Sequence, residues 1–111
     1  AVTIRRSLEV NAVVNAEMLR KQLARSIPPR ARTLFEDERW VVLLADLPFV
    51  SEGLTVDEAL ADLILSLREY AEDWDATLRT APNHAENWAL VQLVNLSTDE
   101  QLSDWIEHSS E

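Results

Sequence analysis

The chain has 111 residues, of which 47% are hydrophobic and 27% are charged, as in one globular domain or two very small ones. It has no cysteine, which excludes disulfides and thiolate metal sites, and it has one glycine, whereas phosphate-binding loops need several. It also lacks a run of about 18 apolar residues, so no membrane span is predicted. These features predict a cytoplasmic protein outside the common nucleotide-dependent enzymes.

The net charge of -10 is distributed unevenly along the chain. Residues 1–33 carry seven basic and two acidic side chains, a net charge of +5, whereas residues 34–111 carry three basic and 18 acidic side chains, a net charge of -15. A basic end joined to an acidic body predicts two partners of opposite charge, such as nucleic acid and a cationic protein. The alternative is that the acidity only keeps the protein soluble.

Residues 1–27 predict a hairpin followed by a helix. Two β-branched runs, at 2–5 and 10–14, flank a polar turn. Because an isolated hairpin is marginally stable in water, we expect a second copy of the chain to cover it. Asn15 is expected to cap a helix that ends before Pro28. The predicted apolar face of this helix consists of Met18, Leu19, Leu23 and Ile27.

Residues 28–32 are the predicted linker, since their prolines coincide with the change in charge sign. A hairpin with a charged turn is expected over 33–45, and Phe49-Val50 is expected to form a further short extended segment. The apolar run at 40–44 suits a central strand that is covered on both faces.

The hydrophobic period becomes helical from Thr55 onward. Thr55 and Glu58 form a capping box, and apolar residues recurring every three or four positions predict a long amphipathic helix over about 55–79. Two short helices are expected to follow, one opened by a capping box of Asn83 with Glu86 and one opened by Ser97 or Thr98 with Glu100 or Gln101.

The predicted fold class is therefore α+β. A small antiparallel sheet carries the long helix on one face, the hairpin–helix segment precedes it, and two short C-terminal helices follow. The side chains expected to be mostly buried are Trp40, Leu44, Leu60, Leu63, Leu67 and Trp74. The four tryptophans, one per element of the second half, are expected to share this core: Trp40, Trp74, Trp88 and Trp105.

The sequence contains no arrangement typical of an enzyme active site. His84 is expected to face solvent at a helix start and His108 to lie in a frayed tail, and no histidine spacing places two metal ligands on one helical face. Carboxylates cluster on the long helix, where a solvated face is favoured over a metal site or an acid–base pair. We therefore expect no enzyme, no metal and no cofactor.

Three segments follow one another in the chain, namely an apolar strand with a D-L-P turn at 40–48, E-G within Ser51-Glu52-Gly53, and T-x-x-E-A within 55–60. Their order resembles the HicB antitoxin family. The resemblance covers about 33–74. Each motif has a local physical reason, which for Gly53 is that glycine can take a positive φ angle.

Residues 2–27 are similar to the second half of a Phd/YefM-type antitoxin domain, a hairpin and then a helix that begins near N-A-x-x-L-R, here Asn15 to Arg20. In this order the chain resembles actinobacterial Phd-like or RelB-like antitoxins fused to a HicB-like module. The leading strand and helix of the Phd domain are not found in the sequence, so no DNA-binding residues are carried over from that family.

The resemblance implies a dimeric transcriptional repressor that binds operator DNA through its N-terminal part and neutralises a small, basic, RelE-type ribonuclease toxin. Residues 1–27 would then be a partial Phd-like segment, and 33–111 a HicB-like module with C-terminal helices. The candidate toxin-binding residues are Glu69, Glu72, Asp73 and Asp75. The candidate DNA-proximal residues are Arg5, Arg6, Arg20, Lys21 and Arg25. The alternatives are an acidic regulatory or adaptor module and, less favoured, a metal-dependent nuclease.

Overall fold

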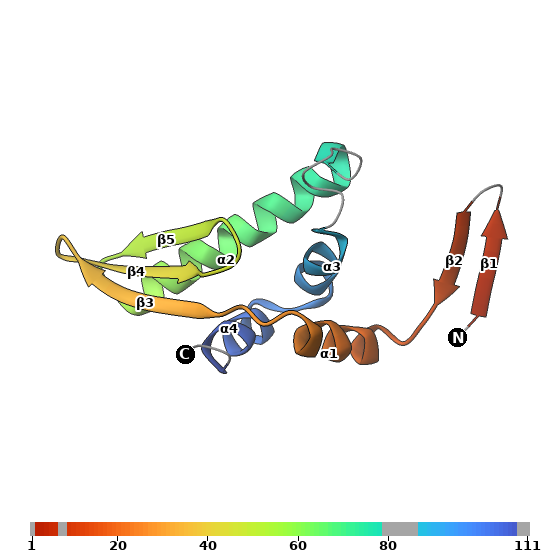
Figure 1. The fold of residues 1–111 in the computed structure, drawn as a ribbon, viewed down its shortest axis with the longest axis horizontal. Coiled ribbons are helices and arrows are strands. Elements are labelled where there is room, and N and C mark those ends of the chain that lie inside the picture. The colour runs from red at the N-terminus through yellow and green to blue at the C-terminus, as the bar shows by residue number, and fades with distance from the viewer. Residues whose placement is uncertain (1, 7–8, 79–86, 109–111) are drawn as a thin grey trace.

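The computed structural model of the protein describes residues 2–6, 9–78 and 87–108, and up to residue 11 it describes the backbone alone. The molecule is elongated, measuring 55 × 28 × 19 Å, with a two-stranded hairpin at one end and a three-stranded sheet at the other (Figure 1). The predicted α+β fold is confirmed. Among the described helices, none is both long and apolar enough to cross a membrane.

The N-terminal hairpin and helix form where the sequence predicts them. Strands β1 (Val2–Arg6) and β2 (Glu9–Val13) pair antiparallel and lead into helix α1 (Ala16–Ser26). The Asn15 side chain caps α1, because its Oδ1 accepts a hydrogen bond of 3.0 Å from the Met18 N–H. The hairpin stands apart from the sheet and is joined to the body through α1 (Figure 1).

The apolar face predicted for α1 is only partly correct. Leu23 is buried, and Leu19 and Ile27 pack against the core, but Met18 is 72% exposed. At 3.6 residues per turn Met18 lies about 140° around the helix from Leu23, too far to reach the same neighbour. Met18 instead shares the solvent side of α1.

The segment predicted as a linker, 28–32, contains two buried residues, Pro29 and Ala31. The Pro29 side chain is fully buried, and the Trp105 Nε1–H donates a hydrogen bond of 2.9 Å to the Ile27 carbonyl just before it. Strand β3 (Ala31–Glu36) begins within this segment, two residues before the expected start. The prolines thus end α1 as predicted and lead directly into the sheet.

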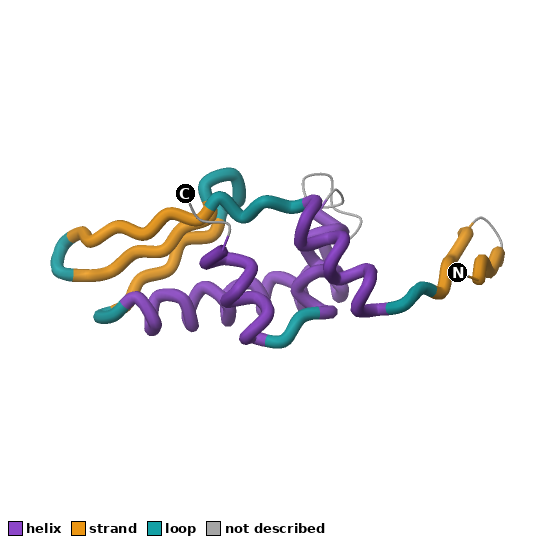
Figure 2. Tube along the Cα trace, turned by 90° about the horizontal axis from the view of Figure 1, so that it is seen from below, coloured by secondary structure: helices purple, strands orange, loops and turns teal. Residues whose placement is uncertain are grey.

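The sheet has the order β3-β4-β5, with β4 (Arg39–Leu44) between β3 and β5 (Phe49–Gly53). Both pairings are antiparallel, and the register aligns Thr33 with Val42 and Val42 with Ser51. The short extended segment predicted at Phe49-Val50 is thus a full third strand. The sheet and the long helix form two layers, so one face of the sheet is inside and the other is outside (Figure 2).

The long helix α2 (Val56–Asp73) continues into a π-helical turn, η1 (Trp74–Leu78), so the predicted span is confirmed. The Thr55 Oγ1 accepts from the Glu58 N–H at 3.1 Å, and the Glu58 carboxylate accepts from the Leu54 N–H at 2.9 Å. These bonds satisfy amide groups at the helix start that would otherwise lack a partner.

Gly53 is required by close packing. Gly53 does not take the positive φ angle that glycine allows, so that freedom is not the reason for a glycine here. A Cβ atom at this position would lie 2.7 Å from the Ala59 nitrogen and 2.7 Å from the Glu58 Cβ. Only glycine therefore lets the end of β5 approach the first turn of α2 so closely.

Helices α3 (Trp88–Leu96) and α4 (Asp99–His108) complete the body, and the two predicted C-terminal helices are thus confirmed. Thr98 and Gln101 form the predicted capping box, since each side-chain oxygen accepts from the other residue's N–H at 2.9 to 3.1 Å. The capping box predicted at Asn83 and Glu86 lies outside the described residues.

The Arg68 side chain of α2 joins α3 to α4. Its guanidinium donates to the Val94 and Ser97 carbonyls at the end of α3, and to the Asp99 carboxylate at the start of α4 at 2.8 and 3.1 Å. Carbonyls in the last turn of a helix lack intrahelical partners, and a cation there is stabilised by the helix dipole. Arg68 therefore contributes to the fold rather than to the charge of the surface.

The core predicted from the sequence is largely confirmed. Five of the six expected side chains are buried: Leu44, Leu60, Leu63, Leu67 and Trp74. Trp40 is only half-buried, because it lies at the far end of the sheet, where its ring packs against the exposed Phe35 with centroids 5.1 Å apart. Of the other tryptophans, Trp105 is buried, whereas Trp88 is 48% exposed at the first turn of α3, so the prediction of one core shared by all four is wrong.

Leu63→Ala should lower the free energy of unfolding by about 2 to 5 kcal/mol, because a fully buried side chain is lost and a cavity remains. Leu65→Ala, two positions away in the same helix and 55% exposed, is the matched control and should change it by less than about 0.5 kcal/mol. Urea denaturation of both variants measures the difference. Equal stabilities would contradict the packing of α2 described above.

Candidate functional site

The solvent face of α2 carries three of the four candidate toxin-binding residues. Glu69, Glu72 and Asp73 are all exposed, and their spacing of three and four residues places them on one side of the helix. The opposite side of α2 is buried against the sheet, so these carboxylates point away from it. The helix thus presents a row of negative charge to solvent.

The fourth candidate, Asp75, also makes a contact within the fold. It lies in η1, and its carboxylate accepts a hydrogen bond of 3.0 Å from the Asn95 side chain on α3. Asp75 is exposed, but this bond ties the end of the long helix to α3. It is therefore already engaged within the fold.

The candidate DNA-proximal residues lie on β1, at the end of the molecule remote from the sheet, and on α1, which lies between the hairpin and the sheet (Figure 1). In β1, Arg5 is paired with Val10 and Arg6 with Glu9. On α1, Lys21 and Arg25 are exposed one turn apart. These four residues thus belong to β1 and α1, which β2 separates in the chain.

Arg20 differs from the other basic candidates on α1 because it forms an ion pair within the helix. Its guanidinium binds the Glu17 carboxylate, with a distance of 3.0 Å between Arg20 Nε and Glu17 Oε2. This hydrogen bond lowers the pKa of Glu17 and raises the pKa of Arg20 from their ordinary values. The pair is therefore fully ionised at neutral pH and weakens only as Glu17 becomes protonated in acid.

The outer face of the sheet, which sequence analysis did not single out, is largely apolar. We use the name outer face for the four apolar side chains that point away from α2: Leu34, Val41, Leu43 and Val50. The register pairs Leu34 with Val41 and Leu43 with Val50, so they are contiguous across all three strands. Leu34 is 43% and Val50 66% exposed.

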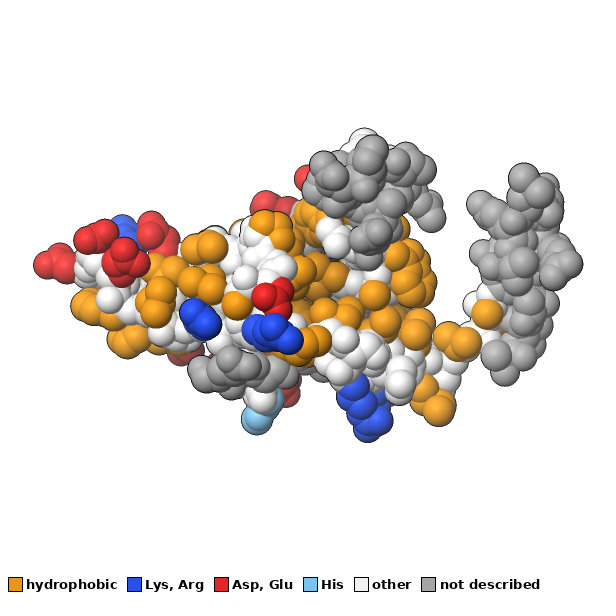
Figure 3. Space-filling model, viewed as in Figure 1, with side chains coloured by type: hydrophobic (Ala, Val, Ile, Leu, Met, Phe, Trp, Pro, Cys, Tyr) orange, Lys and Arg blue, Asp and Glu red, His pale blue; other side chains and the backbone are white. Residues whose placement is uncertain are grey.

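An acidic turn closes the end of this face. The β3–β4 hairpin turns through Asp37 and Glu38, whose φ angles are 51° and 63°, the left-handed pattern of a type I′ turn. Glu36 and Glu52 lie beside them, and these four residues are called the acidic turn below. Figure 3 shows acidic side chains gathered at this end of the sheet, next to hydrophobic ones.

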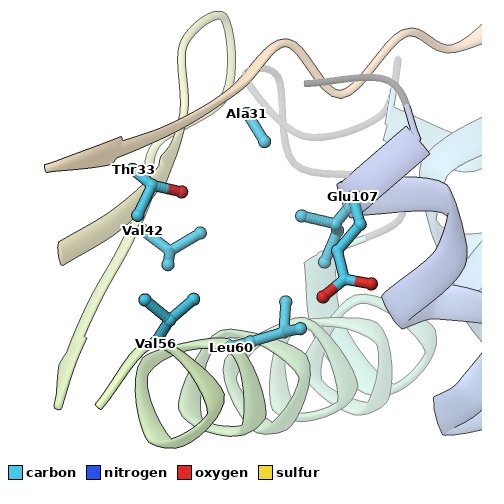
Figure 4. A pocket seen from close by; sticks show the side chains of 7 residues that line it. Ala31, Thr33, Val42, Val56, Leu60 and Glu107 are labelled. Carbon is cyan, nitrogen blue, oxygen red and sulfur yellow. The ribbon is translucent and has the colours of Figure 1, made fainter. Parts of the chain in front are cut away.

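A small cavity lies beneath the inner face of the sheet. It has a volume of about 90 Å³, is bounded by the sheet, α2 and α4, and is partly open to solvent (Figure 4). Its lining side chains are Ala31, Thr33, Val42, Val56, Leu60, Ile106 and Glu107. Glu107 is the one ionisable group among them, so the cavity offers no converging acid–base pair.

The one described histidine, His108, is the last residue of α4, with its Nε2 4.0 Å from the Asp104 carboxylate. It is helical, where a frayed tail was expected, but its side chain is 81% exposed. His84 lies outside the described residues. Within the described part of the chain, no three His, Cys, Asp or Glu side chains lie close enough together to hold a metal ion.

No protein-family model matches the chain, and no curated protein matches it either. A solved structure from Syntrophomonas wolfei subsp. wolfei is similar to it, with a TM-score of 0.73 and 19% sequence identity. The match covers 99% of this chain and 79% of that chain, which is described as an antitoxin part of a proposed toxin/antitoxin system. At this identity the likeness shows the fold alone.

Glu38→Gly should raise the free energy of unfolding by about 0.5 to 1 kcal/mol relative to Glu38→Gln. Both variants remove one charge, but only glycine removes the strain of the left-handed conformation, which is worth about 1 to 2 kcal/mol. Glycine also increases the conformational entropy of the unfolded chain, and this smaller effect offsets part of the gain. Thermal and urea unfolding of the two proteins measure the difference. If the glutamine variant is as stable as the glycine variant, the turn is not strained.

Proposed function

We propose that the chain is the antitoxin of a type II toxin–antitoxin system and acts by binding its toxin, not by catalysis. The observation that carries the proposal is the likeness in fold to the Syntrophomonas protein, which extends over 99% of this chain and thus includes the hairpin end as well as the sheet. The motifs that resemble HicB and Phd/YefM antitoxins agree with this function, although no family model matches the chain.

The charge distribution supports a basic toxin of the RelE type as the partner. Such a toxin is a small ribonuclease that is basic because it engages ribosomal RNA, and the acidic body carries a net charge of -15 over residues 34–111. Glu69, Glu72 and Asp73 are the described carboxylates of α2 placed to attract it. Attraction of this kind mainly accelerates association, while apolar contacts supply most of the affinity.

The N-terminal end supports a second interaction, with operator DNA. Its basic residues Arg5, Arg6, Lys21 and Arg25 lie on β1 and α1, and phosphate contacts by such side chains dominate DNA affinity. The hairpin stands clear of the body, and a two-stranded hairpin needs cover to be stable, so a second copy is the proposed partner of β1 and β2. The proposed unit is a dimeric, autorepressing, cytoplasmic antitoxin.

Expression of the protein encoded beside this gene should arrest growth of a bacterial host, and co-expression of the full-length protein should restore colony formation. The restoration has a physical cause, occlusion of the toxin surface, so the two proteins should also copurify. Growth arrest that persists despite a soluble, folded partner would contradict the proposal. An unrelated acidic protein of similar size is the control.

Glu69→Gln, Glu72→Gln and Asp73→Asn together should reduce the rate of association with this toxin and flatten its dependence on salt. For the wild type, raising the ionic strength to about 1 M shortens the screening length to about 3 Å and should slow association at least about tenfold. Stopped-flow measurements across a salt series provide the rates. Identical rates and salt slopes for both proteins would indicate that this acidity only aids solubility.

RNA cleavage by the chain with Mg²⁺, lost in Asp73→Asn alone, would favour the nuclease alternative.

A further inference from the structure

We propose that the outer face of the sheet and the acidic turn together form the docking surface for a basic protein partner. The inference rests on the proposed function and names the surface on which the toxin is held. It differs from the α2 carboxylates, which lie on the other side of the two-layer body.

The first argument is the arrangement of polarity on the sheet. An antiparallel sheet with one face in water normally alternates apolar residues inside with polar residues outside. Here the outward positions at the centre are apolar, namely Leu34, Val41, Leu43 and Val50, and the charged ones lie at the margins. An apolar centre with a charged rim is the usual composition of a protein–protein interface.

The second argument is the pattern of β4 itself. The apolar run Trp40 to Leu44 is typical of a strand that is covered on both faces, yet α2 covers only the face with Val42 and Leu44. Val41 and Leu43, which point the other way, are half-buried by their neighbours within the sheet. A partner bound to the outer face would bury Val41 and Leu43 fully, as the apolar composition of the strand predicts.

The third argument is charge, which selects the kind of partner. The acidic turn contributes four carboxylates, whereas two arginines, Arg32 opposite Leu43 and Arg39 opposite Glu36, lie on the same face, so the rim is acidic on balance. A second copy docked here would bring its own acidic body, with a net charge of -15, against this rim. A partner with lysine or arginine around an apolar patch instead satisfies both features.

The fourth argument is the backbone of the turn. Asp37 and Glu38 both hold left-handed conformations, at positions where Asn-Gly or Asp-Gly is the favoured pair, so Asp37 suits its position and Glu38 replaces the favoured glycine. For glutamate this conformation is unfavourable, and strain of this kind is concentrated at functional sites. The Glu38 carboxylate at the tip of the hairpin thus persists despite a local destabilisation, as expected if it binds something.

The test compares dissociation rates of the toxin encoded beside this gene from immobilised full-length protein. Asp37→Asn with Glu38→Gly removes two charges from the rim while it favours the turn, so weaker binding cannot be attributed to unfolding. Leu34→Thr with Val50→Thr keeps β-propensity but removes the apolar centre. Each pair should raise the dissociation rate at least about tenfold.

The matched control is Glu69→Gln with Glu72→Gln, which removes the same two charges from the α2 side. It should slow association and leave the dissociation rate within about twofold of wild type. If the wild type does not bind the toxin, the proposed function fails. If the wild type binds but both sheet variants dissociate at its rate, the docking surface is wrong and the proposed function stands. Sedimentation of the chain alone decides the remaining case, because a smaller oligomer for Leu34→Thr with Val50→Thr would assign the outer face to a second copy and overturn the proposal.

Discussion

The close approach of α2 to the inner face of the sheet is the contact on which the rest of the body depends. Gly53 makes it possible at one end, since any Cβ there would collide with the first turn of the helix. Along the interface Leu60, Leu63 and Leu67 are buried, and the same helix then holds α3 and α4 through Arg68. With α2 fixed in this way, one face of the sheet and one side of the helix remain at the surface.

The sequence predicts the elements well because their determinants are local. Capping by Asn15, Thr55 and Thr98 places three helix starts, and the change of hydrophobic period at Thr55 separates strand from helix. What fails is what tertiary geometry decides. At Gly53 the sequence suggests the conformational freedom of glycine as the reason for this residue, whereas the reason is the close contact of β5 with the first turn of α2, which residue spacing does not reveal. Likewise, the spacing of apolar residues places Trp88 on the apolar side of its helix, but Trp88 lies at the exposed first turn of α3.

The candidate site was predictable only in part. Helical periodicity places the carboxylates of α2 on the side opposite its apolar residues, and Glu69, Glu72 and Asp73 are exposed as expected. The engagement of Asp75 by Asn95, and of Arg20 by Glu17, depends on neighbours that the sequence does not place unambiguously. Identifying the outer face requires the sheet register, which the sequence does not give. One signal of it is present in the sequence, namely the unbroken apolar run at 40–44, which is typical of a strand covered on both faces.

A division of labour between charge and apolar contact follows for the proposed complex. Carboxylates distributed over the body attract a basic partner from a distance, whereas a small apolar face with a charged rim can hold it. Carboxyl footprinting by mass spectrometry, with the toxin bound and absent, tests this account most directly. The account predicts that binding shields Asp37, Glu38 and Glu52 from labelling, while Glu69 and Glu72 remain labelled. Unchanged labelling of the acidic turn in a complex that is otherwise fully formed would contradict it.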